Sequence, residues 1–515
     1  MSTGKVYLVG AGPGDPELIT VKGLRFLAQA EVVVYDYLAN EELLAHAPQG
    51  AERIYVGKRG GVHHACSQEE INAILVDKAA AGRQVVRLKG GDPFIFGRGG
   101  EEIEALVAAG IPFEVVPGVT AAVAAATYAG IPITHRGCTS TVAFVTGHED
   151  PTKPDSQIAW DKLATGIGTL VFFMGIKNLS SIMARLEANG RDPATPVAVV
   201  RWASTPEQQT VVGTIRDISD RVREAGLRPP AIIVVGEVVS LRDRINWFER
   251  RPLFGKRIAV TRSRAQASEL VRQLEELGAS CFACPTIEMR PPASWQELDT
   301  ELDQVSSYDW LVFTSANGVE LFMSRLLERG QDVRSLAGPR IAAVGEKTGQ
   351  ALAQRGLRPD LIPEVFQGEG LVASFVGQGI AGQRFLIPRA QEAREVLPEA
   401  LVAAGAQVRL VPVYRNVRPQ GQEEELRRRL AGKQIDLVTF TSSSTVRNFL
   451  AMLQPAGPDE LAQLMAGVQV ASIGPVTSAT ARQAGLPVHI EPPQATIEAL
   501  VACIVRHQLG EDSGG

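Results

Sequence analysis

The second half of this 515-residue chain repeats itself, and this repeat limits the folds that the chain can adopt. The segment GKRIAVTRSRAQ (255–266) returns as GQRFLIPRAQEA (382–393), so that Arg262 corresponds to Arg389, 127 positions later. The same offset relates Gly278 to Gly405, Pro285 to Pro412, Asp309 to Asp436, Thr314 to Thr441 and Phe322 to Phe449, and an offset of 129 relates Gly345 to Gly474, Thr348 to Thr477 and Gly356 to Gly485. Solenoid repeats are roughly 20–50 residues long, so this longer unit predicts two similar domains.

Each repeat unit predicts a doubly wound parallel sheet, because strand-like and helix-like segments alternate along it. Each unit also carries hydroxyl residues at one strand end (FTSANG and FTSSST) and a glycine turn after the next strand (AAVGEKT and ASIGPVT). Backbone N–H groups and hydroxyls at helix starts form anion sites, although the same residues can simply cap their helices. The candidate substrate-binding residues are Arg262, Thr314, Ser315, Arg389, Thr441, Ser442, Ser443, Gly474 and Thr477.

The first half alternates β-branched runs with helical stretches, which is typical of α/β architecture. The expected strands are 6–10, 32–36, 53–57, 84–88, 113–117, 141–147, 169–175, 196–200 and 231–239. A loop between Gly147 and Leu163 is expected to divide this half into lobes at about 1–147 and 148–245. The charged stretch 241–257 interrupts the alternation, so we expect the boundary between the halves there, with 246–254 as a linker.

Composition excludes several classes of protein. With 45% hydrophobic and 21% charged residues the chain is an ordinary globular protein, and its net charge of −5 lacks the strongly basic character of a general nucleic-acid binder. No signal-peptide pattern is seen, and the most apolar later stretch, 119–133, is shorter than the ~20 residues that span a bilayer. Five scattered cysteines predict a reduced, cytoplasmic protein, and the lone pair Cys281 and Cys284 predicts packing rather than a metal site.

The turn GAGPGDPELIT (10–20) follows the first strand and raises the question of dinucleotide binding, since Asp36 lies at about the right distance for a ribose contact. Its spacing argues against that function. Glycines fall at 10, 12 and 14, whereas the fingerprint needs G-x-G-x-x-G running into a helix, and Pro13 and Pro16 favour an extended loop. The turn therefore does not predict a nicotinamide site.

The segment VVRLKGGDPFIFGRGGEE (85–102) is the most specific motif of the chain. Gly90 and Gly91 allow the backbone to approach a ligand closely, and Asp92 supplies a hydrogen-bond acceptor beside it. The two glutamates that end the motif suit the first turn of a following helix. This combination predicts a ligand-binding turn, with an ordinary tight turn as the alternative.

These motifs, with PGVTAAVAAATYAGIPITHR (117–136), YDYLA (35–39), FFMG (172–175) and PAIIVVGEVV (230–239), resemble the tetrapyrrole methylase family, and within it the uroporphyrinogen-III C-methyltransferases, over about residues 5–245. The resemblance implies a two-lobed fold that binds S-adenosylmethionine (SAM) in a cleft between α/β domains. By the same resemblance the cofactor-binding residues are Pro13, Gly90, Gly91, Asp92, Ile95, Thr120, Ala121, Met174, Ala203 and Ala231, with Ala203 standing where many members have glycine.

The resemblance also implies an acid–base pair at Asp36 and Lys58, the latter in VGKRG (56–60). Because SAM is an activated methyl donor, the enzyme must align a ring carbon with the methyl group and let a proton leave the macrocycle, which a carboxylate can accept. Without the surrounding motifs, Asp36 would be expected to cap a turn and Lys58 to be a solvated charge.

The second half resembles the uroporphyrinogen-III synthases over about 255–508, through VTR, the FTS strand ends, PVYRN and IGPVTSATARQAGL. The resemblance implies two domains joined by two linking strands, so that domain one comprises 255–285 plus 416–515 and domain two comprises 290–411. It also implies closure of linear hydroxymethylbilane with inversion of the last pyrrole, without cofactor or metal. We expect Tyr414 to help water leave the hydroxymethyl carbon.

Together the halves predict a bifunctional enzyme, because the product of the second half is the substrate of the first. The enzyme would form uroporphyrinogen III and then methylate its carbons 2 and 7 with SAM to give precorrin-2. It would act as a homodimer through the methylase half, with no nucleic-acid or membrane partner. The alternative is a methylase of a later corrin intermediate fused to a non-catalytic tetrapyrrole-binding module.

Overall fold

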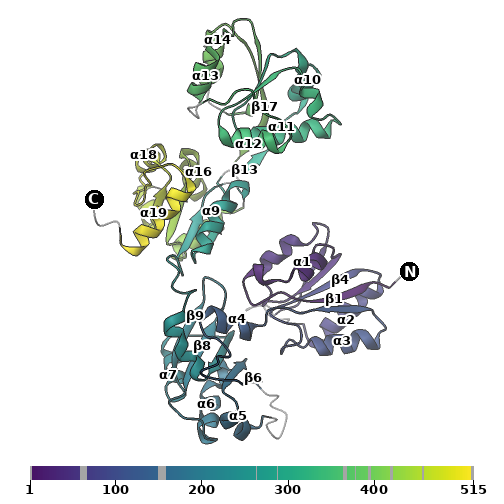
Figure 1. The fold of residues 1–515 in the computed structure, drawn as a ribbon, viewed down its shortest axis with the longest axis vertical. Helices are drawn as coiled ribbons and strands as arrows, with labels where there is room; N and C mark the ends of the chain where they lie inside the picture. The colour runs from purple at the N-terminus through teal and green to yellow at the C-terminus, as the bar shows by residue number, and fades with distance from the viewer. Residues whose placement is uncertain are drawn as a thin grey trace. The chain divides into compact units, whose positions relative to one another are not determined.

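The computed structural model describes residues 3–57, 66–148, 158–262, 264–286, 288–363, 368–376, 379–392, 396–417, 421–454 and 457–511 (Figure 1). The chain divides into two compact units, one built mainly from residues up to Arg257 and the other mainly from Phe282–Ile504. Among the described residues, no helix is long and apolar enough to cross a membrane.

The first sheet is entirely parallel and has the strand order β3-β2-β4-β1-β5. Its strands are β1 (Lys5–Gly10), β2 (Val32–Tyr35), β3 (Glu52–Tyr55), β4 (Gln84–Lys89) and β5 (Phe113–Val116). The helices are α1 (Val21–Leu27), α2 (Gln68–Ala80) and α3 (Gly99–Ala108). Successive residues of β1 point to opposite faces of the sheet. Val9 packs in one core with Leu27 of α1, whereas Leu8 packs in the other with Leu75 of α2 and Leu106 of α3. Both faces are therefore covered, as Figure 1 shows, and the carboxyl ends of the strands share one edge.

The second sheet is mixed and has the strand order β6-β7-β10-β8-β9. Its strands are β6 (Val142–Thr146), β7 (Thr169–Phe173), β8 (Pro196–Arg201), β9 (Gln209–Thr214) and β10 (Ala231–Val235). The remaining helices of this half are α4 (Ala121–Tyr128), α5 (Trp160–Gly166), α6 (Leu179–Ala188), α7 (Ile218–Glu224) and α8 (Arg242–Ile245). β6 and β7 are parallel, and the other neighbours are antiparallel.

The division between the lobes lies earlier than the sequence suggested. Strand β6 pairs with β7, and α4 packs its alanines, including Ala122 and Ala125, against Val171 and Val200 of the second sheet. The expected boundary near residue 147 is therefore wrong, because both elements bury their apolar side chains in the second core. Two smaller expectations also fail: α5 begins at Trp160, within the segment up to Leu163 that was expected to be a loop, and the segment 231–239 leaves the strand for a 3₁₀ helix at Glu237–Leu241.

The second half contains two further sheets, which exchange strands between the repeat units. The strands are β11 (Arg257–Val260), β12 (Ser280–Ala283), β13 (Glu288–Arg290), β14 (Trp310–Phe313), β15 (Arg340–Ala343), β16 (Arg384–Ala390), β17 (Gln407–Val417), β18 (Leu437–Phe440) and β19 (Gln469–Ser472). One sheet has the order β12-β11-β18-β19 and the other β13-β17-β16-β14-β15. Each sheet thus joins the first two strands of one repeat unit to the last two of the other.

The helices of this half follow the repeat. They are α9 (Arg264–Glu276), α10 (Gln296–Asp303), α11 (Ala316–Glu328), α12 (Glu346–Gln354), α13 (Gly368–Val376), α14 (Val396–Ala403), α15 (Glu423–Ala431), α16 (Ser443–Leu453), α17 (Pro458–Leu464), α18 (Pro475–Gln483) and α19 (Ile497–Leu509). The short strand β13 pairs antiparallel with the end of β17, which places the two segments expected to link the domains beside each other.

Corresponding residues of the two repeat units occupy corresponding places. Phe313 and Phe322 meet edge to face with centroids 5.3 Å apart at 80°, and Phe440 and Phe449 do so at 5.3 Å and 78°. The bridge between Ala342 and Leu361 likewise recurs as the bridge between Ala471 and Ile490. The prediction of two similar α/β domains is confirmed, but each sheet is assembled from strands of both repeat units rather than of one, and β13 adds an antiparallel strand to the second of them.

Candidate functional site

Three loops meet backbone to backbone at the carboxyl edge of the first sheet. A Cβ on Gly10 would lie 2.6 Å from the Cα of Gly118, and a Cβ on Gly118 would lie 2.3 Å from the carbonyl oxygen of Gly91. Gly91 has φ of +68° and exchanges backbone hydrogen bonds with Gly12, with N···O distances of 2.7 and 3.3 Å. Only glycine allows this approach, so the loops form a cradle with a fixed backbone.

Asp92 ties two of these loops together. Its Oδ1 accepts a hydrogen bond from the amide of Phe94 at 2.8 Å, and its Oδ2 accepts one from the amide of Gly118 at 3.0 Å. The second bond joins the GGD turn to the loop that leads into α4. Replacing this carboxylate would release both amides, so Asp92 fixes the shape of the cradle.

The expected cofactor-binding residues gather around this cradle. The Cβ position of Gly91 lies 3.5 Å from the amide nitrogen of Ala121, at the start of α4. Thr120 is the N-cap residue of α4, is 9% exposed and makes no side-chain capping bond. Ile95 and Ala121 pack against the same apolar cluster. Pro13 lies on the neighbouring turn between Gly12 and Gly14.

The second sheet contributes to the same unit a set of residues in strained backbone conformations, here called the rim. Met174, Trp202 and Ser204 all have positive φ, at 54°, 49° and 68°, which is unfavourable for residues with side chains. A Cβ on Gly14 would lie 3.1 Å from the carbonyl oxygen of Ala203, and Ser204 Oγ accepts a hydrogen bond from the amide of Asp15 at 3.1 Å. The GPG turn therefore rests directly on this rim.

Ala231 and Met174, two further residues expected to bind the cofactor, lie at the end of the second sheet where β7 and β8 finish and β10 begins. Ala231 begins β10 and pairs with Arg201, the residue that precedes the strained rim. Met174 follows β7 and is 54% exposed, beside Phe173, whose ring stands 4.9 Å from that of Phe96 in the segment after the GGD turn.

Asp36 is connected to a network of buried charged side chains. Arg87 Nη2 is 2.8 Å from Asp36 Oδ2, and Arg87 Nε is 3.3 Å from Glu102 Oε1, which Lys89 Nζ approaches to 2.7 Å. Arg87 is 3% exposed, Lys89 4% and Glu102 not at all. Burial lowers the pKa of Lys89 below its ordinary value, and the nearby positive charge of Arg87 acts in the same direction. Asp36 Oδ1 also accepts the amide of Leu38 at 3.0 Å.

Sequence reasoning did not find Arg87, Lys89 or the buried position of Glu102. Lys58, the other half of the expected acid–base pair, lies outside the described residues. The signal that was available is the presence of two cations at alternate positions in the otherwise apolar strand QVVRLK, which places both on one face of a buried strand. A buried charge needs a partner, and Glu102 supplies it from α3.

In the second half, Ser315 and Tyr414 meet at the carboxyl edge of one sheet. Their hydroxyl oxygens are 3.3 Å apart, and Ser315 Oγ also accepts the amide of Gly318 as the cap of α11. Tyr414 is 8% exposed, with its ring in the apolar core. Arg389, 6% exposed, is the penultimate residue of β16 and precedes Ala390, which pairs with Tyr414, and Thr314 follows β14.

The other expected residues follow strands at the carboxyl edge of the other sheet, β12-β11-β18-β19. Ser442 caps α16 by accepting the amide of Thr445, and Ser443 Oγ accepts a hydrogen bond from the hydroxyl of Thr480 at 2.8 Å. Gly474 precedes α18, and Thr477 within it is 5% exposed. Burial lowers the pKa of Arg262 below its ordinary value. Thr441, like the others, follows a parallel strand. Capping and ligand binding are compatible, because a capped helix start keeps other N–H groups free.

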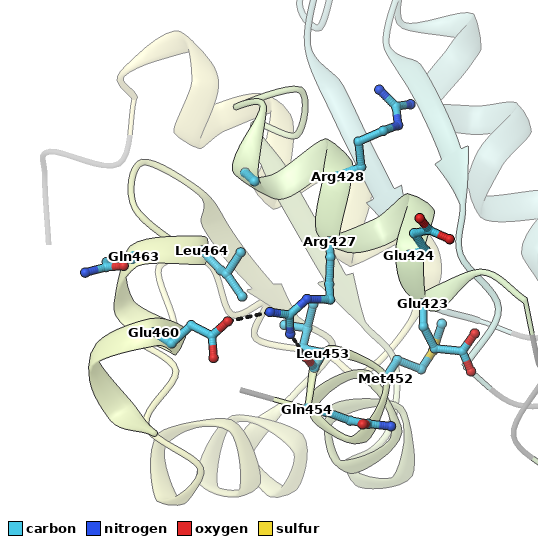
Figure 2. A pocket seen from close by; sticks show the side chains of 11 residues that line it. Glu423, Glu424, Arg427, Arg428, Met452, Leu453, Gln454, Glu460, Gln463 and Leu464 are labelled. Atoms are coloured by element: carbon cyan, nitrogen blue, oxygen red, sulfur yellow. Dashed lines mark hydrogen bonds and ion pairs between the residues drawn. The ribbon is translucent and has the colours of Figure 1, made fainter. Parts of the chain in front are cut away.

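A pocket of 940 Å³ lies elsewhere, among α15, α16 and α17 (Figure 2). Arg427 crosses it, donating to the carbonyl of Leu453 and pairing with Glu460. Leu453 ends α16, the end remote from Ser442, so none of the expected substrate-binding residues lines the pocket.

The cysteines pack as ordinary side chains. Cys281 and Cys284 form no disulfide, and burial raises the pKa of Cys284 to about 12. In the described part of the chain, no three His, Cys, Asp or Glu side chains converge as metal ligands would.

Comparison with known proteins gives separate matches for the two halves. Residues 5–219 match the family of tetrapyrrole (corrin/porphyrin) methylases, and residues 268–502 match uroporphyrinogen-III synthase HemD. A porphyrin biosynthesis protein HemD from Ruminiclostridium josui is 39% identical over 471 residues, which cover 92% of this chain and 93% of that protein. An S-adenosyl-L-methionine-dependent uroporphyrinogen III methyltransferase from Methanosarcina barkeri is 53% identical over 240 residues, 47% of this chain and 94% of that protein. The solved uroporphyrin III C-methyl transferase of Thermus thermophilus is 43% identical, covers 46% of this chain and all of that one, and has a TM-score of 0.40.

Proposed function

This chain belongs to the tetrapyrrole methylases in its first half and to the uroporphyrinogen-III synthase HemD family in its second, and we propose that it carries out two consecutive steps of tetrapyrrole biosynthesis. The second half closes hydroxymethylbilane to uroporphyrinogen III, with inversion of the last ring. The first half transfers two methyl groups from SAM to carbons 2 and 7, giving precorrin-2. The presence of both families in one chain supports this order of reactions, because uroporphyrinogen III would be the product of the second half and the substrate of the first.

The observation that carries the methylase proposal is the glycine cradle at Gly10, Gly91 and Gly118. A cradle without side chains, next to the start of α4, fits a flat adenine and its ribose, and the strained rim at Met174, Trp202 and Ser204, with Ala203 between the last two, lies in the same unit. When bound there, SAM supplies an electrophilic methyl group. Pro13, Gly90, Asp92, Ile95, Thr120, Ala121 and Ala231 would complete the site around it.

The chain's own contribution to methyl transfer is alignment and proton removal. Exposed apolar side chains such as Tyr37, Leu38, Phe94 and Phe96 surround the site and can hold a flat macrocycle while excluding water. Asp36 is 24% exposed at its side chain and is held by Arg87 with its carboxylate at the sheet edge. In this position it can accept the proton that leaves the methylated ring, and Lys58 is proposed as its partner.

For ring closure we propose that Tyr414 acts at the hydroxymethyl carbon. Its hydroxyl is 3.3 Å from Ser315 Oγ, so Ser315 orients the proton that assists loss of water. Thr314, Arg389 and the hydroxyls and helix starts of the other sheet edge are proposed to bind the carboxylates of the substrate. Ring closure then follows from holding the two ends of the chain together.

The proposal extends to assembly and location. We propose a homodimer through the methylase half, which light scattering at micromolar concentration tests: a monomer would contradict it. We also propose that the protein works in the cytoplasm, since its five cysteines form no disulfide, which suits a reducing compartment.

One assay tests the central proposal. The full chain is incubated with hydroxymethylbilane and methyl-labelled SAM, and a dimethylated macrocycle is expected. Uroporphyrinogen III without methylation would show that the methylase acts on a later corrin intermediate. Methylation of added uroporphyrinogen III without ring closure would show that the second half is a non-catalytic binding module.

A further inference from the structure

The segment Arg242–Phe254, here called the brace, lies between the two halves and outside the residues matched to the methylase family. The sequence suggested a linker at 246–254. In the structure this segment is docked on the first unit: Phe248 is 4% exposed, and the indole N–H of Trp247 donates to the carbonyl of Thr127 at 3.0 Å. A tether that only joined two domains would not bury an aromatic side chain in this way.

The brace packs against the carboxyl end of α4. Tyr128, the last residue of α4, packs against Trp247 and Phe248 with ring centroids 5.3 and 4.8 Å away. Arg242 donates to the carbonyl of Ala129. Gly130 has φ of +69°, and a Cβ there would lie 2.6 Å from the carbonyl oxygen of Ile245, so the backbones touch. The start of this same helix borders the cradle.

Glu249 connects the brace to the rim of the cofactor site. Its Oε1 accepts hydrogen bonds from Gln208 Nε2 at 2.7 Å and from Thr210 Oγ1 at 2.6 Å, while its other oxygen pairs with Arg242. Gln208 Oε1 in turn accepts the amide of Ser204 at 3.1 Å. Both ends of the Gln208 amide are thereby oriented, and Ser204 is held in its strained conformation.

The contacts that pass through Gln208 and Ser204 and those that pass through Tyr128 both end at Asp15 of the GPGD turn. Ser204 Oγ accepts the amide of Asp15 at 3.1 Å, and the hydroxyl of Tyr128 donates to Asp15 Oδ2 at 3.1 Å. Burial and the charge of Asp15 raise the pKa of Tyr128 to about 12, which keeps this hydroxyl protonated as the donor. The turn that carries Pro13 is thus fixed from two sides by contacts that begin in the brace.

We propose that the brace is a working part of the methylase and that Glu249 is a positioning residue for its SAM site. This inference rests on the proposed function of the first half. It places the end of the methylase after the segment that the sequence assigned to a linker. It also explains why Glu249, which does not touch the cradle, sits among three hydrogen-bonding side chains.

The test compares Glu249→Ala with Glu249→Gln in the full chain. Alanine removes the acceptor for Gln208 and Thr210, and we expect the dissociation constant of S-adenosylhomocysteine and the KM for SAM to rise about tenfold, with kcat little changed. Glutamine keeps one acceptor oxygen and should restore most of the affinity. Asp243→Ala, on the same segment with an exposed side chain, is the matched control and should bind as the parent does. Ring closure should be unaffected in all three.

A double variant tests whether Glu249 affects the SAM site through Ser204. If Glu249 acts through Ser204, combining Glu249→Ala with Ser204→Ala should weaken binding less than the two separate effects predict. Should Glu249→Ala fail to fold, Trp247→Phe, which loses the N–H bond to Thr127 and part of the ring packing against Tyr128, weakens the contact of the brace with the end of α4, and binding should again fall. Binding unchanged in Glu249→Ala, or in Trp247→Phe where that is used, would overturn the inference. Parent protein that does not bind S-adenosylhomocysteine would instead overturn the proposed function.

Discussion

The guanidinium of Arg87 lies 2.8 Å from the carboxylate of Asp36 and, on its other side, 3.3 Å from the fully buried Glu102. One buried cation therefore links the proposed proton acceptor to the interior of the first sheet. Glu102 Oε2 has no hydrogen-bond partner among the described residues, so its charge depends on Arg87 and Lys89. This arrangement makes Asp36 sensitive to changes that do not touch substrate.

Arg87→Met should destabilise the protein and lower methylation. Removing one partner from a buried ionic network leaves uncompensated charge and costs about 3–5 kcal/mol. The free energy of unfolding, from urea denaturation, checks this. Arg98→Met is the matched control, since Arg98 and Glu101 form a pair with side chains 57% and 49% exposed, for which the expected loss is about 0–1 kcal/mol. Equal losses in both variants would contradict the importance of the buried network.

Asp92→Ala should weaken binding of S-adenosylhomocysteine while ring closure of hydroxymethylbilane stays unchanged. The variant loses the acceptors for the amides of Phe94 and Gly118, so the cradle relaxes. Isothermal titration calorimetry gives the affinity. Asp92→Asn keeps one acceptor and should bind with intermediate affinity. Loss of both activities in Asp92→Ala would show that the two halves do not function separately.

Gly118→Ala should disrupt the cradle, because the new Cβ would lie 2.3 Å from the carbonyl oxygen of Gly91. The backbone must move to relieve this contact, at a cost of about 1–3 kcal/mol, and cofactor affinity should fall with it. Gly100→Ala is the control: it lies in α3 with no atom within 4 Å of its Cβ position, and it should be neutral or slightly stabilising. Thermal melts with and without S-adenosylhomocysteine separate the two effects. Identical behaviour of both variants would refute the packing argument.

Tyr414→Phe should slow enzymatic ring closure with inversion by roughly 10²–10³, the effect of removing one donor at a reacting oxygen. The measurement is the ratio of isomer III to isomer I, because hydroxymethylbilane closes spontaneously to the uninverted isomer I. Tyr308→Phe removes a hydroxyl that donates to Glu301 at 2.6 Å in the same unit, and it should lower stability without changing this ratio. An unchanged ratio in Tyr414→Phe would show that Tyr414 only packs in the core, where its ring already lies.

Local pattern was sufficient to place several parts of the candidate site. The GGD turn could be recognised because Gly90 and Gly91 have no side chains and precede Asp92, and in the structure this turn lies next to the start of α4. Ser315 and Ser442 could be read as helix starts, and both cap their helices. The alternating cations of β4 indicated a buried charge, but its partner Glu102 could not be assigned, because Glu102 lies at the start of a helix, where an acidic residue is ordinarily explained by the helix dipole.

The sequence alone determined that the second half contains two similar parallel-sheet domains, since the repeat fixes the order of strands, caps and glycine turns in each unit. Only the tertiary structure decided that the brace packs on the first unit, that β6 pairs within the second sheet and α4 packs against it, and that Arg87 and Glu102 share a buried site. The physical reason is that sequence periodicity reports the exposure of an element, whereas its partner is chosen by contacts between distant segments. Asp15 meets Ser204 across 189 residues, and no local pattern in either segment records that meeting.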